Sequence, residues 1–135
     1  TPEQLNTFNR NTLMEHLGIE ILEIGNDFLR ARMPVDERTH QPLGLLHGGA
    51  SVALIESLGS IGSSLLIDLD NEYPVGLEVN ANHIGSAKSG FVEAIAKIIH
   101  AGKSTHVWTV EIRGVDSEKL ICIGRLTTMI IQNKK

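Results

Sequence analysis

The chain has 135 residues, a formal net charge of −4 at pH 7, and hydrophobic residues at 41% of its positions. This length suits a single domain over residues 1–135 and excludes two ordinary ones. The acidic balance argues against a nucleic-acid-binding surface, and the hydrophobic content argues against disorder. Cys122 is the single cysteine, which excludes an intrachain disulfide and a cysteine-rich metal site. We therefore expect no metal and no bound cofactor.

The first residues lack a basic segment followed by an apolar run, so we expect no secretory signal and a cytoplasmic location. Residues 2–16 are expected to form one helix. Pro2 is favourable at the beginning of a helix, and Gly18 marks the end of the pattern.

Strand-like stretches dominate the rest of the chain, because Val, Ile and Thr are frequent in them. A hairpin over 19–25 and 28–35 precedes a loop over 36–47. After the central segment, four strands follow without an intervening helix, over residues 75–84, 91–100, 105–113 and 119–131. This order is not the alternation of strands and helices that a parallel sheet requires, so it predicts a largely antiparallel sheet.

Residues 49–67 are predicted to form a long apolar helix. Their length approaches that of a membrane span, but several serines and glycines and one glutamate favour a buried helix instead. We predict an α+β domain in which the sheet curls around this helix. On a helical wheel, one side is aliphatic and consists of Ala50, Leu54, Leu58, Ile61 and Leu65. The opposite side carries small and hydroxyl residues with one acid, namely Gly49, Ala53, Glu56, Ser60, Ser63 and Ser64.

Glu56 is the only charged residue between Leu46 and Ile67. A buried carboxylate without a partner is costly, so it must be paired, protonated or near water. Ser60 lies one turn further along the helix, within reach of the carboxylate. Glu56 is therefore either a structural acid held by Ser60 or by an arginine, or a chemically active group.

The helix begins after Leu46 with His47, Gly48 and Gly49. The glycines leave the first backbone N–H groups unobstructed, and such a helix end can stabilise a developing oxyanion. The alternative is that the glycines permit a tight turn and that His47 caps or packs. Gly48 and Glu56 are eight residues apart, or roughly 12 Å at about 1.5 Å per residue. If both groups act on one carbonyl, they come from two chains, so the spacing indicates a two-fold dimer with composite sites.

Several motifs resemble one family over nearly the whole chain. The central motif runs from Gln41 to Ser51 (QPLGLLHGGAS) and is followed by Glu56 and Ser60. Further matching stretches are residues 33–36 (MPVD), 76–83 (GLEVNANH) and 125–128 (RLTT). Together they resemble the hotdog-fold acyl-CoA thioesterases, most closely the branch that hydrolyses aroyl-CoA esters such as 4-hydroxybenzoyl-CoA and 1,4-dihydroxy-2-naphthoyl-CoA. The resemblance implies a long central helix wrapped by a curved antiparallel sheet, in homodimers that pair into homotetramers.

The resemblance also implies roles for individual residues. Glu56 is the catalytic nucleophile or general base, and the Gly48 N–H polarises the thioester carbonyl. Gln41 and His47 hold the carbonyl region, and Ser60 orients water or Glu56. Substrate contacts are assigned to His83, Ser86, Gly49, Ser63 and Ser64. Taken alone, His83 could equally be a satisfied histidine at the edge of the core.

The CoA phosphates require cations, for which the candidates are Lys88, Lys103 and Arg113, although each is equally well explained as an ordinary solvated side chain. Ile84 and Gly85 stand where this branch often has an arginine. The remaining histidines are interpreted as surface or loop residues, namely His16, His40, His100 and His106.

The resemblance favours an aromatic or naphthoyl acyl group, with menaquinone biosynthesis as one setting, while medium-chain fatty acyl esters stay open. The sequence lacks the Gly-x-Ser-x-Gly motif of serine hydrolases. The alternative from another functional class is a non-catalytic acyl-CoA binding or sensing module with the same fold, and a dehydratase or hydratase ranks last. No nucleic-acid or membrane partner is expected.

Overall fold

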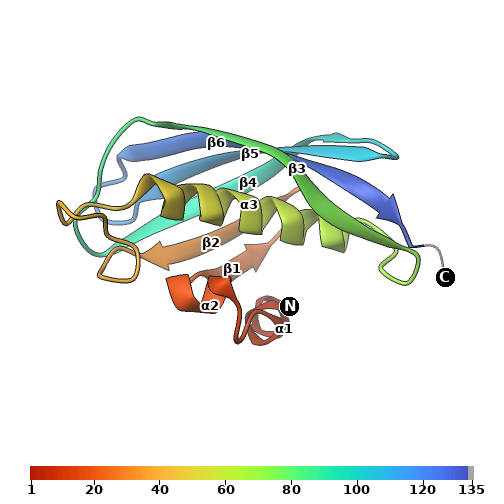
Figure 1. Ribbon diagram of the computed structural model, residues 1–135, viewed down its shortest axis with the longest axis horizontal. Helices are drawn as coiled ribbons and strands as arrows, with labels where there is room; N and C mark the ends of the chain where they lie inside the picture. Colours follow the sequence, from red (N-terminus) through yellow and green to blue (C-terminus); the bar gives the residue numbers. More distant parts are fainter. Residues whose placement is uncertain (134–135) are drawn as a thin grey trace.

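The computed structural model describes residues 1–133, which form one sheet, one long helix and two short helices (Figure 1). In chain order the elements are α1 (Pro2–Phe8), α2 (Leu13–Leu17), β1 (Glu20–Ile24), β2 (Phe28–Pro34), α3 (Gly48–Leu65), β3 (Glu72–His83), β4 (Phe91–Ala101), β5 (Thr105–Gly114) and β6 (Leu120–Gln132). Within residues 1–133, no helix is both long and apolar enough to cross a bilayer.

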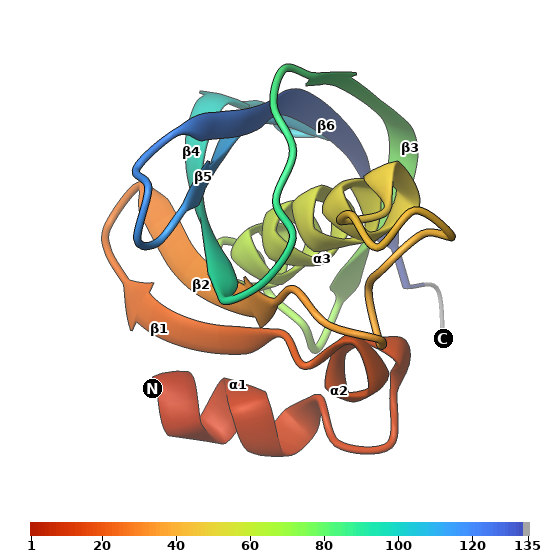
Figure 2. The same cartoon turned by 90° about the vertical axis from the view of Figure 1, so that its left-hand side faces the viewer.

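The sheet has six strands in the order β1-β2-β4-β5-β6-β3, and every neighbouring pair is antiparallel. It curves around α3, while α1 and α2 lie outside the curve next to β1 (Figure 2). The predicted α+β hotdog architecture, with a curved antiparallel sheet around a central helix, is confirmed. Since β3 is at the end of the strand order, one of its edges is unpaired within this chain.

The N-terminal segment differs from the prediction of one helix over 2–16. It forms two helices, because the chain turns between Asn9 and Thr12, where Asn11 adopts a left-handed conformation with φ 63°. Asparagine tolerates this conformation better than most residues with a side chain. Gly18 ends α2 with φ 75°, as its position in the sequence indicates.

The inner face of α3 packs directly on the sheet. Leu54, Ile55 and Leu58 are fully buried. Gly59 and Gly62 lie so close to Leu126 and Trp108 that a Cβ at either glycine would collide with the facing side chain. The backbone of α3 therefore approaches the sheet more closely than a helix with larger residues could.

The predicted aliphatic side of the helix is partly wrong. Leu65 is about half exposed (48%), whereas Ile55 and Ser63 belong to the buried face. The reason is that a curved sheet contacts more than one narrow side of a helix, so the buried arc is wider than the aliphatic stripe on the wheel. Ser63 is 0% exposed and is not on the exposed side that carries Glu56.

Ser63 is the centre of a buried polar network. Its Oγ accepts a hydrogen bond from the Trp108 indole N–H (2.9 Å) and also lies 2.8 Å from His106 Nδ1 and 2.9 Å from Thr128 Oγ1. His106 is 4% exposed, so its interpretation as a surface residue is wrong. These bonds satisfy the Ser63 hydroxyl inside the core, so the network replaces the substrate contact that was assigned to Ser63.

The pKa of His106 provides a test of this network. Burial lowers the pKa of His106 from its ordinary value of 6.5, and nearby His100 lowers it further. The unfolded chain therefore binds a proton below about pH 6.5 while the folded chain does not. Stability is fully present above this pH and decreases as the pH falls toward the folded-state pKa. We expect His106→Gln to remove this part of the pH dependence, measured by chemical denaturation between pH 7.5 and about 5.

His16→Gln is the matched control, because His16 is exposed on α2. The control should keep the pH dependence of the unmodified chain. If the free energy of unfolding of His106→Gln changes with pH as steeply as that of the unmodified chain, another group is responsible for the pH dependence.

Candidate active site

The start of α3 presents one backbone donor without a partner. His47 is the N-cap, and its Nδ1 accepts a hydrogen bond from the Gly49 N–H at 2.7 Å. Its side chain therefore caps the helix, which was one of the two roles left open by the sequence. Among residues 1–133, the preceding N–H, that of Gly48, has no hydrogen-bond partner. The positive end of the helix dipole makes this free donor suitable for a negatively charged oxygen.

His83, at the end of β3, lies beside Gly48. A Cβ at position 48 would be only 2.8 Å from His83 Nε2, so glycine is what permits this close approach. The His83 side chain is exposed rather than part of the core edge. The structure thus brings an imidazole and the free Gly48 N–H together at one end of the molecule.

Glu56 lies two turns further along α3, on its outer side. The expectation of a buried acid is wrong, because Glu56 is exposed in this chain. No hydrogen bond or ion pair within residues 1–133 reaches its carboxylate, and none joins it to Ser60. Instead, Ser60 accepts a bond from the Ser64 hydroxyl through its carbonyl oxygen at 3.0 Å. The proposed structural role of Glu56, held by Ser60 or an arginine, is therefore not observed in the described part of the chain.

Sequence reasoning missed Gly76, a residue of β3 that faces this carboxylate. A Cβ at position 76 would collide with Glu56 Oε2, so only glycine leaves room for the acid. The pairing of β3 with β6 also shifts register between Gly76 and Glu78. A glycine inside a strand is a known signal of a bulge or a close approach, and here it marks both.

An exposed strip of small residues surrounds the acid on α3. We call it the small-residue strip and define it as the residues on either side of Glu56, namely Gly49, Ala53, Ser60 and Ser64. Gly49 is exposed, like Glu56, and the other members are partly buried. The strip is continuous with the start of the helix and contains no bulky side chain that would prevent another backbone from approaching.

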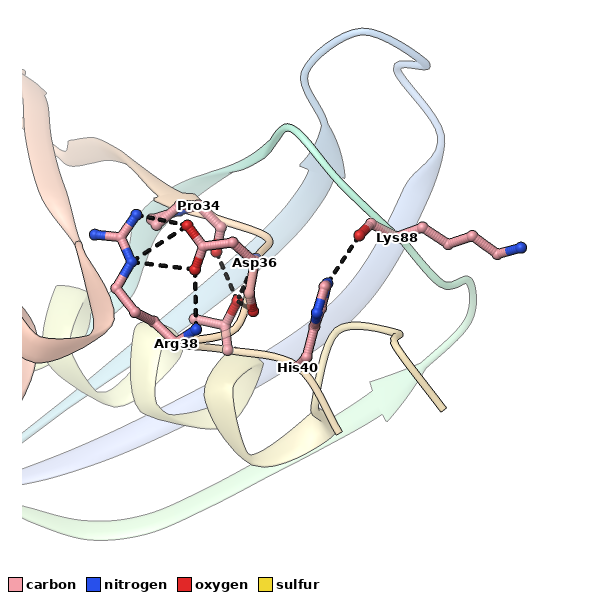
Figure 3. A network of polar contacts seen from close by, with 6 residues as sticks. Pro34, Asp36, Arg38, His40 and Lys88 are labelled. Atoms are coloured by element: carbon pink, nitrogen blue, oxygen red, sulfur yellow. Dashed lines mark hydrogen bonds and ion pairs between the residues drawn. The ribbon is translucent and has the colours of Figure 1, made fainter. Parts of the chain in front are cut away.

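Two loops meet beside the start of α3 (Figure 3). His40 donates from Nε2 to the Lys88 carbonyl oxygen (2.8 Å), and the Leu46 N–H donates to the Ala87 carbonyl oxygen (2.8 Å). Gln41 begins a turn in the first loop, where its Oε1 accepts from the Leu43 N–H. The carbonyl end of Gln41 is thus occupied by the turn, which leaves its amide NH2 as the end available for donation.

The three candidate cations lie in different places. Lys88 lines a surface groove of about 270 Å³ together with Ser86 and Lys119, a lysine that sequence reasoning missed. Arg113 is on the outer face of the sheet, where it lies 3.5 Å from Glu111 and donates to the Glu118 carbonyl oxygen. Lys103 is in the turn between β4 and β5, at the end of the sheet opposite Gly48 (Figure 1).

The arrangement brings together, at the start of α3, the Gly48 N–H and the His83 imidazole, and it places the Glu56 carboxylate further along the same helix. Among residues 1–133, no group of three or more potential metal ligands of the His, Cys, Asp and Glu type is present. The groups described can bind a polarised carbonyl oxygen and can activate water or attack directly.

Comparisons with known proteins agree with this chemistry. A family model described as "Thioesterase superfamily" matches residues 43–121. A curated protein of Pseudomonas aeruginosa, "Putative esterase PA1618", is 52% identical over 129 residues, which cover 96% of this chain and 88% of that protein. A 1,4-dihydroxy-2-naphthoyl-CoA hydrolase of Escherichia coli is 46% identical over 131 residues, covering 97% and 95%. The crystal structure of a mutant of thioesterase PA1618 superimposes with a TM-score of 0.95 at 50% identity, covering 98% and 95%.

A glycine-to-alanine substitution tests the contact at the start of the helix. Gly48→Ala should displace the exposed His83 side chain while changing the free energy of unfolding by less than about 1 kcal/mol, because alanine is well tolerated in a helix. The measurement is the shift of the His83 imidazole resonances in NMR spectra. The His106 resonances should not move, because His106 contacts Ser63 near the other end of α3. Unchanged His83 resonances would contradict the contact.

Proposed function

Because the chain belongs to the thioesterase superfamily, we propose that it hydrolyses an acyl-CoA whose acyl group is aromatic or naphthoyl, giving the free acid and CoA. The observation that carries the proposal is the free Gly48 N–H at the start of α3 and the free Glu56 carboxylate further along it. The choice of acyl group is supported by the relative named as a 1,4-dihydroxy-2-naphthoyl-CoA hydrolase. With a 1,4-dihydroxy-2-naphthoyl group as the acyl group, the setting that we propose is menaquinone biosynthesis.

The chain is an enzyme, a thioester hydrolase, so the alternative of a non-catalytic binding module is not retained. We propose that the protein is cytoplasmic, and its single cysteine, Cys122, which is buried and not in a disulfide, is compatible with this location.

In the proposed reaction, the thioester carbonyl oxygen lies at the start of α3. The Gly48 N–H and the helix dipole stabilise the negative charge that develops on this oxygen when the carbonyl carbon is attacked. The Gln41 amide NH2 supplies a second donor. His47 contributes by holding the first turn of the helix in place through its bond to the Gly49 N–H.

Glu56 performs the attack or activates water for it. As a general base, its carboxylate removes a proton from water while the water oxygen bonds to the carbonyl carbon, and the C–S bond then breaks to release CoA. As a nucleophile, the carboxylate displaces CoA and forms an anhydride, which water hydrolyses. Both routes give the acid and the thiol.

The length of α3 requires two chains for one site. Gly48 and Glu56 are eight residues apart on one unbroken helix, roughly 12 Å at about 1.5 Å per residue. A glutamate side chain cannot span this distance around one carbonyl. We therefore propose a two-fold dimer in which Glu56 of one copy meets Gly48 of the other.

The shape of the chain supports this dimer. The strand β3, whose Gly76 contacts Glu56, has one edge unpaired within residues 1–133 and carries two exposed apolar side chains, Val75 and Leu77. An exposed strand edge with apolar side chains is a surface that a second copy can extend and cover. Pairing of such dimers into tetramers, as the family resemblance implies, is part of the same proposal.

The first test concerns the acid. Glu56→Gln should lower kcat for an aroyl-CoA by about 100-fold or more, because glutamine can neither accept a proton from water nor attack. Release of the CoA thiol, followed with a thiol-reactive dye, is the measurement. Glu3→Gln, at an exposed acid of α1, is the control and should keep full activity. Full activity of Glu56→Gln would exclude the proposed role.

The second test concerns the two-chain site. Gly48→Pro removes the backbone donor, and proline is tolerated in the first turn of a helix after the extended His47 (ψ 130°). Its Cβ also displaces His83, so Gly48→Ala, which adds a Cβ but keeps the N–H, is the matched control and should stay more active than Gly48→Pro. Gly48→Pro and Glu56→Gln should each be inactive. After subunit exchange in an equal mixture, about half of the dimers are mixed, and each mixed dimer has one intact site out of two. The mixture should therefore recover about a quarter of the unmodified activity.

Two measurements control this experiment. The circular dichroism spectrum of Gly48→Pro should match that of the unmodified chain, and each variant incubated alone under the exchange conditions should remain inactive. A mixture that stays inactive although mixed dimers are detected by mass spectrometry would place both groups in one chain.

A further inference from the structure

A cavity of about 280 Å³ lies between α2 and the start of α3. One wall is apolar and consists of Leu13 and Leu17 of α2 and Ala53 of α3. Leu13 is 62% exposed, which is unusual for a leucine that lines a concave surface. An apolar ligand in this cavity would cover Leu13 and remove its surface from water, which is favourable.

The cavity begins where the thioester carbonyl is proposed to bind. His47 and Gly49 line it, and they are the residues on either side of Gly48. The cavity is therefore the pocket next to the Gly48 N–H on the α2 side, and a group attached to a carbonyl carbon bound there is placed next to it. A thioester carbonyl has two such groups, the acyl group and the sulfur with its CoA arm.

Charge decides which of the two groups fits. Arg38 lines the cavity, but its guanidinium donates to both carboxylate oxygens of Asp36 (Nε at 3.1 and 3.2 Å, Nη2 at 2.6 Å), so its charge is already paired. The groove on the other side of the loop contact is lined by Lys88, Lys119 and one acid, Asp116, so its two lysines leave a surplus of one positive charge. Neither lysine forms an ion pair within residues 1–133. A polyanionic CoA nucleotide matches that groove, and an apolar acyl group matches the cavity.

Figure 3 shows the contact between the two loops, made by His40 and Lys88. The His40 ring, which lines the cavity, donates to the backbone carbonyl of Lys88, whose side chain extends away into the groove side. This hydrogen bond joins the wall of the cavity to the edge of the groove. One loop contact thus lies between the cavity and the groove.

We propose that this cavity receives the acyl group and that Leu13 and Leu17 of α2 limit the size of the acyl group that the enzyme accepts. The inference rests on the proposed thioesterase function. It assigns a role to two residues of α2 that lie outside the motif from Gln41 to Ser51 and outside α3. The helix α2 contacts α3, and residues with left-handed backbone flank it on both sides, Asn11 (φ 63°) and Gly18 (φ 75°). The preferred acyl group is one apolar ring system, contacted by leucines on one side and by the small residues of α3 on the other.

The test measures binding separately from turnover. The probes are free CoA and S-phenacyl-CoA, a thioether that carries an aromatic ring in place of the acyl group and cannot be hydrolysed at its C–S bond by water. The unmodified enzyme should bind S-phenacyl-CoA more tightly than CoA, as measured by calorimetry. Leu13→Trp should fill the cavity and weaken S-phenacyl-CoA binding about tenfold or more, with CoA binding unchanged within about twofold.

The controls keep the two proposals distinguishable. Leu69→Trp, at a leucine of similar exposure (59%) in the turn between α3 and β3, should leave both dissociation constants unchanged. Leu13→Ala should weaken S-phenacyl-CoA binding without filling the cavity. Equal effects of Leu13→Trp on both probes, or no effect, would overturn the assignment of the cavity, as would equal affinity of the unmodified enzyme for the two probes. Failure of the unmodified enzyme to hydrolyse both benzoyl-CoA and 1,4-dihydroxy-2-naphthoyl-CoA would instead overturn the proposed function.

Discussion

The rigid length of α3 is the constraint on which the arrangement of this protein depends. A helix keeps its residues at constant spacing, so the free N–H of Gly48 and the carboxylate of Glu56 are held roughly 12 Å apart at about 1.5 Å per residue. Neither group can move to the other without breaking the helix. One carbonyl can contact both only if a second helix brings its own acid, which makes dimerisation part of the chemistry that we propose rather than an addition to it.

Glycines permit the close contacts that position this helix. On its inner face, Gly59 and Gly62 admit Leu126 and Trp108 of the sheet, which lets the helix lie deep inside the curve. At its start, Gly48 admits His83. In each case a single Cβ would displace a neighbouring side chain. Glycine is needed at these positions because it is small and not because its backbone is flexible.

The polar groups on the two sides of α3 differ in whether they have hydrogen-bond partners. On the inner side, the Ser63 hydroxyl is bonded to Trp108 and contacts His106 and Thr128, so the buried polar groups have partners and cost little. On the outer side, Glu56 has no partner within residues 1–133 and remains exposed in a single chain. A carboxylate kept free of partners is available for chemistry, whereas one held by an arginine is not.

Much of this molecule was predictable from its sequence, for identifiable reasons. Strand alternation, the order of the elements and the long apolar segment predicted the antiparallel sheet around one helix, because hydrophobic periodicity is a local property of the chain. The motif from Gln41 to Ser51 indicated the family, which the comparisons confirm. The spacing from Gly48 to Glu56 is the basis of the composite site that we propose, because helix geometry is the same in every protein.

Other features depended on contacts between residues far apart in the sequence, which no local pattern contains. The wheel placed Ser63 beside Glu56, but the curve of the sheet buries it against His106, 43 positions along the chain. The cavity under α2 and the contact of Gly76 with Glu56 likewise exist only because segments distant in the sequence are packed together. The sequence alone thus determined the strands and the long helix, while the tertiary structure decided which side chains are buried and which are exposed, because burial depends on the sum of all neighbours.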